Sequence, residues 1–140
     1  MIRKFEKNDI DGVMQIWLSG NLDAHSFISD EYWKSNYNLV QEQIQQADIF
    51  VYEDKGRIYG FIGIVEGYIA GIFVDKDYRN HSIGKMLIEY VKQYYDVLTL
   101  NVYRKNERAV SFYHRQGFST VSESIDCDTN EVEYKMKWES

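Results

Sequence analysis

The stretch Val74-Asp75-Lys76-Asp77-Tyr78-Arg79-Asn80-His81-Ser82-Ile83-Gly84-Lys85-Met86-Leu87 joins an apolar run to a periodic one. The preceding run, residues 69–74, is typical of a buried strand. The apolar residues that follow recur at the spacing of one helix face: Ile83, Met86, Leu87, Tyr90, Val91 and Tyr94. A strand that enters a helix through a short polar turn directs free backbone N–H groups and the positive end of the helix dipole at one point. The sequence therefore predicts an anion site in this turn.

Three residues of the turn suit an anionic ligand. Arg79 supplies a planar donor that matches phosphate. Gly84 lets a ligand approach the backbone closely, because it has no side chain. Ser82 is a residue type that caps helices while it still presents its own N–H group.

Composition bounds the class of protein. The chain has 140 residues, 44% of them hydrophobic and 16% aromatic, which predicts one folded domain over residues 1–140. The net charge of −6 argues against a partner that is a nucleic acid. The single cysteine, Cys127, permits no intrachain disulfide, and no window is apolar enough for a signal peptide or a membrane span. We expect a cytoplasmic protein with no membrane partner.

The first half of the chain predicts a strand and two helices. Residues 1–5 read as a short strand, and Asn8 or Asp9 offers a cap for an amphipathic helix that ends near Gly20. A loop over residues 21–28 follows, and a second helix over residues 29–44 carries aromatic and aliphatic residues on one face.

Three strand patterns come next. Residues 49–52 and 58–65 flank the tight turn 54–57, which has glycine where a positive φ is required. Glu66-Gly67 then turns the chain into the strand that ends at Val74. Strands joined by turns this short form an antiparallel meander.

The last part of the chain alternates helices and strands. After the helix from Ser82 to about Tyr95, the apolar strand 97–103 requires a parallel, right-handed crossover. A helix opens at Asn106 and stops at Gly117, and residues 121–138 form a closing hairpin. The order β-α-α-β-β-β-α-β-α-β-β predicts an α/β fold: a mixed sheet with helices on both faces.

Two segments carry a family resemblance. Arg79-Asn80-His81-Ser82-Ile83-Gly84 resembles the acyl-CoA signature Arg/Gln-x-x-Gly-x-Gly/Ala of the GNAT acetyltransferases, with Ser82 in place of the first glycine. The family pattern N-x-x-A-x-x-F-Y-x-x-x-G-F is intact at Asn106, Ala109, Phe112, Tyr113, Gly117 and Phe118. Residues 24–28 are similar to the Ala-His-x-Phe-Ile segment of small bacterial members of the YiaC and YjaB type. The element order is that of the GNAT fold, with splayed central strands.

The resemblance implies an N-acetyltransferase that uses acetyl-CoA. The acetyl group would pass directly, in a ternary complex, to a primary amine of a small molecule, a lysine side chain or a protein N-terminus. The peptide-like pantetheine arm would lie along the edge of residues 72–74, splayed from the strand that carries Asn101. The positions assigned to acetyl-CoA are Ile72, Phe73, Val74, Arg79, Asn80, His81, Ser82, Ile83, Gly84, Lys85, Asn101, Asn106, Ala109 and Phe112. The sequence is compatible with a monomer or a homodimer.

Catalytic roles are less constrained. By resemblance, Tyr113 is the general acid that protonates the leaving thiolate; otherwise it is a core aromatic. Two residues are candidates for the base. One is Glu66, which would otherwise be only a solvated turn residue, and the other is His25, because an unperturbed histidine titrates near neutrality. His25, Phe27 and Tyr68 are the candidates for binding the acceptor.

The sequence lacks the motifs of several other classes of site. The three histidines lack the spacing of metal ligands, so no metal is predicted. A P-loop is excluded because Met86 follows Gly84-Lys85, and no Gly-x-Gly-x-x-Gly motif supports a dinucleotide-binding domain. The alternative from another class is a catalytically weak acetyl-CoA-binding sensor or interaction module. The presence of Ser82 in place of the first glycine of the family signature would favour this alternative.

Overall fold

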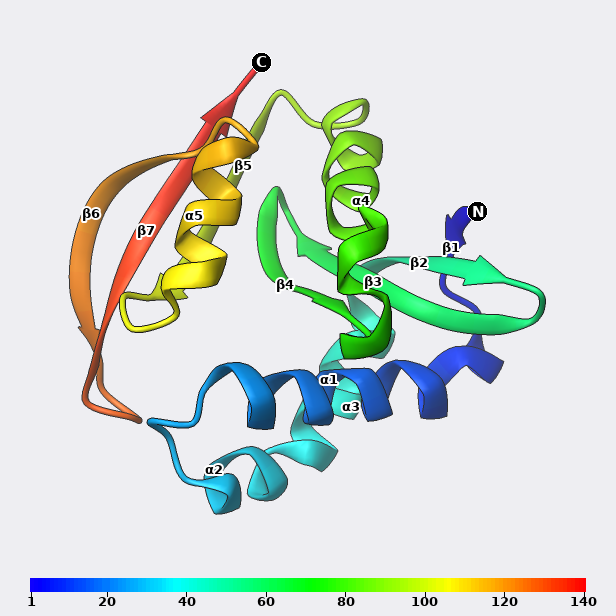
Figure 1. Ribbon diagram of the computed structural model, residues 1–140, viewed down its shortest axis with the longest axis horizontal. Helices are drawn as coiled ribbons and strands as arrows, with labels where there is room; N and C mark the ends of the chain where they lie inside the picture. The colour runs from blue at the N-terminus through cyan, green and yellow to red at the C-terminus, as the bar shows by residue number, and fades with distance from the viewer.

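One seven-stranded sheet runs through the protein, in the order β1-β2-β3-β4-β5-β7-β6 (Figure 1). The computed structural model describes residues 1–140 apart from the side chains of Asn80 and His81. The strands are β1 (Ile2–Lys4), β2 (Asp48–Asp54), β3 (Arg57–Val65), β4 (Tyr68–Val74), β5 (Val97–Tyr103), β6 (Ser119–Asp126) and β7 (Glu131–Glu139). The helices are α1 (Ile10–Ala24), α2 (Asp30–Ser35), α3 (Tyr37–Gln46), α4 (Ile83–Lys92) and α5 (Glu107–Arg115), with short 3-10 turns η1 (Lys7–Asp9) and η2 (Lys76–His81).

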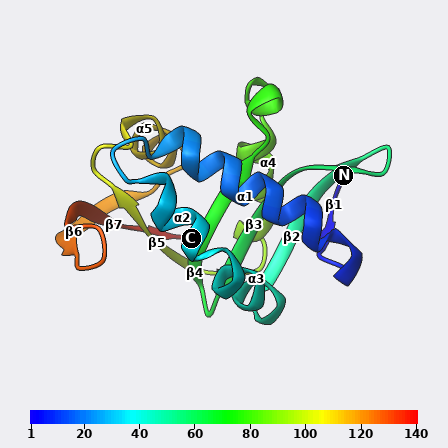
Figure 2. The same ribbon diagram turned by 90° about the horizontal axis from the view of Figure 1, so that it is seen from below.

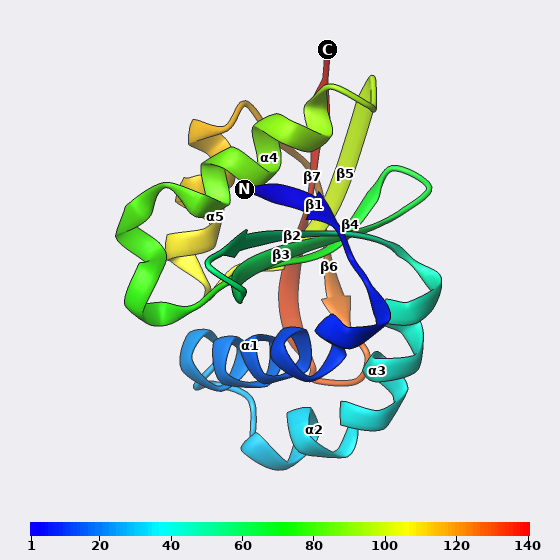
Figure 3. The same ribbon diagram turned by 90° about the vertical axis from the view of Figure 1, so that its right-hand side faces the viewer.

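Helices cover both faces of the sheet, as predicted. In Figure 3, α4 and α5 lie on one side of the strands and α1, α2 and α3 on the other. Figure 2 shows α1 crossing in front of β3 and β4. The buried side chains form two clusters, one under α4 and α5 and one under α1 to α3. None of the described helices is both long and apolar enough to cross a membrane.

The meander of β2, β3 and β4 confirms the prediction. Both strand pairs are antiparallel. Lys55 and Gly56 in the first turn have φ values of 52° and 79°, and Glu66 and Gly67 in the second have 51° and 82°. Two consecutive residues with positive φ match the twist of the flanking strands, which explains why each turn needs only two residues.

The crossover from β4 through α4 to β5 is parallel, also as predicted. The helix is shorter than its apolar pattern suggested, since it ends at Lys92 rather than near Tyr95. Tyr94, beyond the end of the helix, is 62% exposed, and its ring stacks on that of the core residue Phe50 with 6.5 Å between the ring centroids.

The predicted end of the first helix at Gly20 is wrong. α1 continues to Ala24. A side chain at Gly20 would place its Cβ 3.1 Å from the ring of Phe73, so this glycine permits α1 to pass close over β4. A glycine that serves close packing inside a helix looks, in sequence, like one that ends it.

The predicted second helix is in fact two helices. Asn36 separates α2 from α3, and its side-chain amide donates to the carbonyl of Tyr32 at 2.7 Å. A short polar side chain that bonds to nearby backbone competes with the helical hydrogen bonds. The predicted apolar face survives the break, because Trp33 and Ile44 are both buried.

Candidate active site

A cleft opens where β4 and β5 stop pairing. Parallel pairing joins Tyr68 to Thr99 and Ile69 to Leu100, and no further residues of the two strands are paired in the described structure. Beyond this point β4 stays with β3, while β5 stays with β7. The edge of β4 that faces β5 therefore presents unpaired backbone groups, as the sequence predicted.

A β-bulge accompanies the separation. Gly63 pairs with Gly71 and Ile64 with Ile69, which leaves Ala70 without a partner on β3. An extra residue bends the bulged strand and increases its twist. The small residues Ala70 and Gly71 accommodate this bulge, which turns β4 away from β5 at the start of the cleft.

The cleft has a volume of about 990 Å³ and collects most of the residues predicted from the sequence. They come from β4, the turn before α4, β5, α5 and the end of α1. The predicted residues that line it are His25, Tyr68, Ile72, Phe73, Val74, Arg79, Ser82, Gly84, Lys85, Asn101, Asn106, Ala109, Phe112 and Tyr113.

Three predicted residues, Glu66, Ile83 and Phe27, do not line the cleft. Glu66 lies in the exposed turn between β3 and β4, outside the cleft. Ile83 is 2% exposed and packs in the core under α4. Phe27 packs beside the cleft, with its ring 5.7 Å from that of His25, but does not line it. Asn80 and His81 lie outside the residues whose side chains the structure describes.

Ser82 starts α4 in an unusual backbone conformation. Its φ and ψ are 60° and 21°, in the left-handed region. The predicted cap is absent, because the Ser82 side chain accepts no hydrogen bond from the helix. Serine thus occupies a conformation that glycine adopts at little cost. Two residues on, a Cβ at Gly84 would lie 3.3 Å from the ring of Phe112, so the backbone is closely approached there as well.

The cleft is basic although the whole chain is acidic. Among the described residues that line it there are three carboxylates, Asp23, Glu107 and Glu133. The cations number five: Arg79, Lys85, Lys105, Arg108 and Arg115. In a chain of net charge −6 this excess of cations around one cleft favours an anionic ligand.

Arg79 is paired with an acidic residue across the mouth of the cleft. Its guanidinium donates to Asp23 Oδ2, at the end of α1, at 2.7 Å. The pKa of Asp23 is lowered from its usual value, mainly by Arg79 and to a smaller extent by Lys76 and Arg108. An anion bound at Arg79 would compete with this carboxylate.

The start of α5 contributes two predicted residues. Asn106 caps the helix, with its side-chain oxygen accepting from the backbone N–H of Ala109 at 3.3 Å. Tyr113 is 7% exposed, and among the described residues its hydroxyl has no hydrogen-bond partner. Burial, and secondarily Tyr68, raise the pKa of Tyr113. The phenol therefore stays protonated at physiological pH and can donate to a ligand.

His25 links α1 to α5 through hydrogen bonds. Asn21 donates its amide to the carbonyl of Trp17 at 2.9 Å, which turns its oxygen toward His25 Nδ1 at 3.0 Å. The other ring nitrogen, Nε2, lies 3.1 Å from the amide nitrogen of Asn106. The amide nitrogen of Asn106 can only donate, so Nε2 accepts this hydrogen bond with its lone pair. The ring proton is therefore assigned to Nδ1, which donates to the Asn21 oxygen.

The burial of His25 corrects the prediction that this residue titrates near neutrality. Burial lowers the pKa of His25 from 6.5 to about 4. Its ring also stacks on Trp33 at 5.3 Å and meets the edge of Tyr103 at 5.2 Å. Because both nitrogens are engaged, His25 is poorly placed to act as a base, and it instead fixes the side chain of Asn106.

Sequence reasoning missed one end of the cleft. Glu133 of β7 and Tyr103 of β5 line it as cross-strand partners. The Tyr103 hydroxyl donates to Asp126 Oδ2 at 2.7 Å. The sequence predicted the hairpin that contains β7, but not that one face of this strand lines the cleft beside β4.

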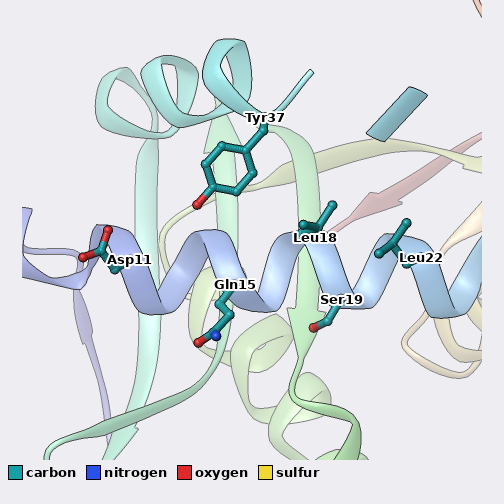
Figure 4. Close-up of a pocket in the computed structure, with 6 residues that line it drawn as sticks. All are labelled: Asp11, Gln15, Leu18, Ser19, Leu22 and Tyr37. Atoms are coloured by element: carbon teal, nitrogen blue, oxygen red, sulfur yellow. The ribbon is translucent and has the colours of Figure 1, made fainter. Parts of the chain in front are cut away.

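A smaller hollow of about 450 Å³ lies outside the cleft, between α1 and α3 (Figure 4). It is lined by Asp11, Gln15, Leu18, Ser19, Leu22 and Tyr37. Figure 4 shows Tyr37 of α3 pointing toward α1, which carries the other labelled residues. In the described part of the chain, no three His, Cys, Asp or Glu residues are grouped so as to hold a metal ion.

Comparison with known proteins agrees with this geometry. Residues 45–120, which include the parted strands and all of α5, match the acetyltransferase (GNAT) domain. The chain belongs to the GNAT acetyltransferase family. It is 34% identical over 140 residues to the peptidyl-lysine N-acetyltransferase YiaC of Escherichia coli K12, covering 99% of this chain and 96% of the relative. The chain is thus an N-acetyltransferase.

Solved structures of GNAT proteins support the fold. The apo form of YjaB from Escherichia coli superimposes with a TM-score of 0.88 at 26% identity, over 99% of this chain and 96% of that one. An acetyltransferase from Bacillus anthracis, solved in complex with acetyl coenzyme A, matches 67% of this chain and 62% of its own length, with a TM-score of 0.62 and 26% identity. The predicted GNAT fold is confirmed.

Proposed function

We propose that this GNAT protein transfers the acetyl group of acetyl-CoA directly to the side-chain amine of a lysine in a protein or peptide. The observation that carries the proposal is the basic cleft between β4 and β5, with an unpaired strand edge on one side and the Tyr113 hydroxyl on the other. The lysine acceptor is supported by the similarity to YiaC, a peptidyl-lysine N-acetyltransferase.

The donor fits the cleft in two ways. Its pyrophosphate suits the N-terminus of α4, where Arg79 and Lys85 line the cleft and backbone N–H groups are free. Its pantetheine arm carries amide groups that can bond to the free edge of β4 over residues 70–74, as an added strand would. The acetyl complex of the Bacillus anthracis relative supports the choice of donor.

The chemistry requires a nucleophile, a leaving group and two proton transfers. The neutral amine attacks the thioester carbonyl, so that a C–N bond forms and the C–S bond breaks. The electron pair of the broken bond stays on sulfur, and the buried Tyr113 hydroxyl protonates it. Burial raises the pKa of Tyr113 above that of an exposed phenol, so the phenol gives up its proton less readily. Tyr113 therefore acts in large part by donating a hydrogen bond to the sulfur as negative charge develops there.

The alternative function, an acetyl-CoA-binding module without turnover, rested on Ser82. The structure gives this residue a left-handed conformation at the start of α4. The serine therefore does not prevent the turn from approaching a ligand, and the alternative loses its main support.

The test is an acetyl-transfer assay read by mass spectrometry. Purified protein is incubated with acetyl-CoA and an N-terminally blocked peptide that contains one lysine, with the same peptide carrying norleucine as the control. We expect addition of one acetyl group to the lysine peptide alone, and a kcat about 100-fold lower for Tyr113→Phe with an unchanged Kd for acetyl-CoA. Binding of acetyl-CoA without transfer to this peptide, free amines or protein N-termini would favour the binding module.

A further inference from the structure

The acceptor end of the cleft contains a carboxylate to which neither the sequence nor the family comparison assigned a role. We propose that Glu133 is the base that takes a proton from the incoming ammonium group. This inference rests on the proposed acetyl transfer. It replaces Glu66 and His25, since Glu66 lies outside the cleft and both nitrogens of His25 are occupied.

The position of Glu133 follows from strand register. Leu98, Leu100 and Val102 of β5 pack in the core that contains Tyr113, under α4 and α5. The alternate residue Tyr103 faces the opposite side, among the side chains under α1 to α3. Glu133 is the cross-strand partner of Tyr103, and directly opposed residues project from the same face of a sheet.

Acid and base would therefore approach the reaction from opposite faces of the sheet. Tyr113 comes from α5 on one face and Glu133 from β7 on the other, and both line one cleft because β4 and β5 have parted. Tyr68 is close enough to interact electrostatically with both, since its pKa is raised by burial and then by Glu133, and Tyr68 in turn contributes to the raised pKa of Tyr113.

Of the carboxylates that line the cleft, Glu133 also has the fewest stabilising electrostatic interactions. Asp23 is paired with Arg79, and Glu107 lies in the first turn of α5 at the positive end of the helix dipole. In the described part of the chain Glu133 forms no ion pair. Partial burial and the neighbouring Asp126 raise its pKa, which makes the carboxylate more basic than an exposed one.

Several other titratable or charged groups face this carboxylate. They are Asp126 of β6, Tyr103 of β5, Tyr68 of β4, Tyr32 of α2 and, two residues along the same face of β7, Lys135. Burial raises the pKa of each of the three tyrosines, so they remain neutral between pH 5 and 9. Glu133, whose pKa is raised, is then the group whose loss of charge on acidification the pH profile reports.

In the proposed reaction the ammonium nitrogen loses two protons and the sulfur gains one. The Glu133 carboxylate accepts one proton from the ammonium, and the freed lone pair attacks the thioester carbon. As the C–S bond breaks, Tyr113 gives its proton to sulfur. The nitrogen loses its second proton, which restores the Tyr113 hydroxyl. One proton in total leaves to solvent, from Glu133, and the products are the amide and the thiol of CoA.

The test compares Glu133→Gln with wild type over pH 6 to 10, using the lysine peptide. Without a base only the amine that is already neutral reacts, so kcat/KM of the variant should rise about tenfold per pH unit toward the amine pKa of about 10. The wild type should be nearly flat over this range. We expect a loss of about 100-fold at pH 7 that narrows as the pH rises.

Matched variants separate a base from a structural residue. Glu139→Gln removes a carboxylate from the same face of β7, outside the cleft, and should behave as wild type. Glu133→Asp keeps a carboxylate and should retain the flat profile at a reduced rate. Acetyl-CoA binding, measured by calorimetry, should be unchanged in all three and shows that each variant is folded.

Two results would overturn the assignment. One is a Glu133→Gln enzyme with kcat/KM within threefold of wild type at pH 7 and an unaltered pH profile. The other is a raised KM for the peptide with an unaltered profile, which would make Glu133 an acceptor-binding residue and not a base. A wild-type protein that binds no acetyl-CoA or transfers no acetyl group would instead contradict the proposed function itself.

Discussion

The two ends of the cleft are built differently. The end that we propose for the donor uses backbone groups and cations from one short segment, residues 70–85, in which strand, turn and helix follow directly in the sequence. The end that we propose for the acceptor assembles Tyr68, His25, Tyr103 and Glu133 from four separate parts of the chain. Binding a common donor needs little beyond backbone geometry, whereas positioning a proton acceptor requires side chains that only the tertiary structure brings together.

The largest effect is expected at His25, which connects the two ends. Its pKa is about 4 in the folded protein and 6.5 as an unperturbed group, so between these values the unfolded chain binds the extra proton. The His25 contribution to stability is present above pH 6.5 and is lost as the pH falls toward 4. The loss amounts to about 3 kcal/mol.

Urea unfolding of wild type and His25→Phe between pH 4 and 7.5 measures this contribution. Phenylalanine keeps a ring against Trp33 but removes the titration and both hydrogen bonds. The variant should be less stable at pH 7, and the stability difference should shrink on acidification. A difference that does not change with pH would mean that His25 is not held neutral by the fold.

A smaller effect tests competition at the donor end. Asp23→Asn releases Arg79 from its ion pair and removes a negative charge near the phosphates, so the Kd for acetyl-CoA should fall about two- to fivefold. Arg79→Ala should raise that Kd about tenfold, because a charge-assisted hydrogen bond is lost.

The control for this pair is Glu123→Gln. Glu123 forms a surface pair with Arg104 at 3.7 Å, outside the cleft, and its neutralisation should leave the Kd unchanged. If Asp23→Asn weakened binding of acetyl-CoA, Asp23 would help to hold the ligand rather than compete with it.

The smallest effect concerns Ser82. Replacement by glycine relieves about 1 kcal/mol of left-handed strain, while the greater freedom of glycine in the unfolded chain offsets about 0.5 to 1 kcal/mol of that gain. The free energy of unfolding should therefore change by less than about 1 kcal/mol, and the Kd for acetyl-CoA by less than twofold.

Lys55→Gly is the matched variant, since Lys55 has a φ of 52° in a turn remote from the cleft. Similar stability changes in the two variants would show that backbone strain alone is involved. A large gain in acetyl-CoA affinity for Ser82→Gly, absent for Lys55→Gly, would show that serine impairs the donor site.

The sequence predicted features that depend on local chemistry. Gly56 and Gly67 mark turns that need positive φ, and Asn106 caps α5. It failed where a residue has the right type for one role but is used for another. Gly20 accommodates Phe73 instead of ending α1.

The site was predicted to different extents at its two ends. Arg79, Gly84 and Tyr113 could be located from motifs, because their neighbours along the chain fix their surroundings. The depressed pKa of His25 and the placement of Glu133 depend on burial and on strand register between distant segments. Neither quantity is encoded in spacing along the chain.

A calorimetric titration of the wild-type protein with acetyl-CoA, with ATP as a control for simple phosphate binding, tests directly whether the cleft binds acetyl-CoA. We expect one acetyl-CoA site per chain with a Kd in the micromolar range or below, and much weaker binding of ATP, which cannot pair with the edge of β4. No binding of acetyl-CoA at millimolar concentration, or equal affinity for ATP, would contradict the assignment of the cleft.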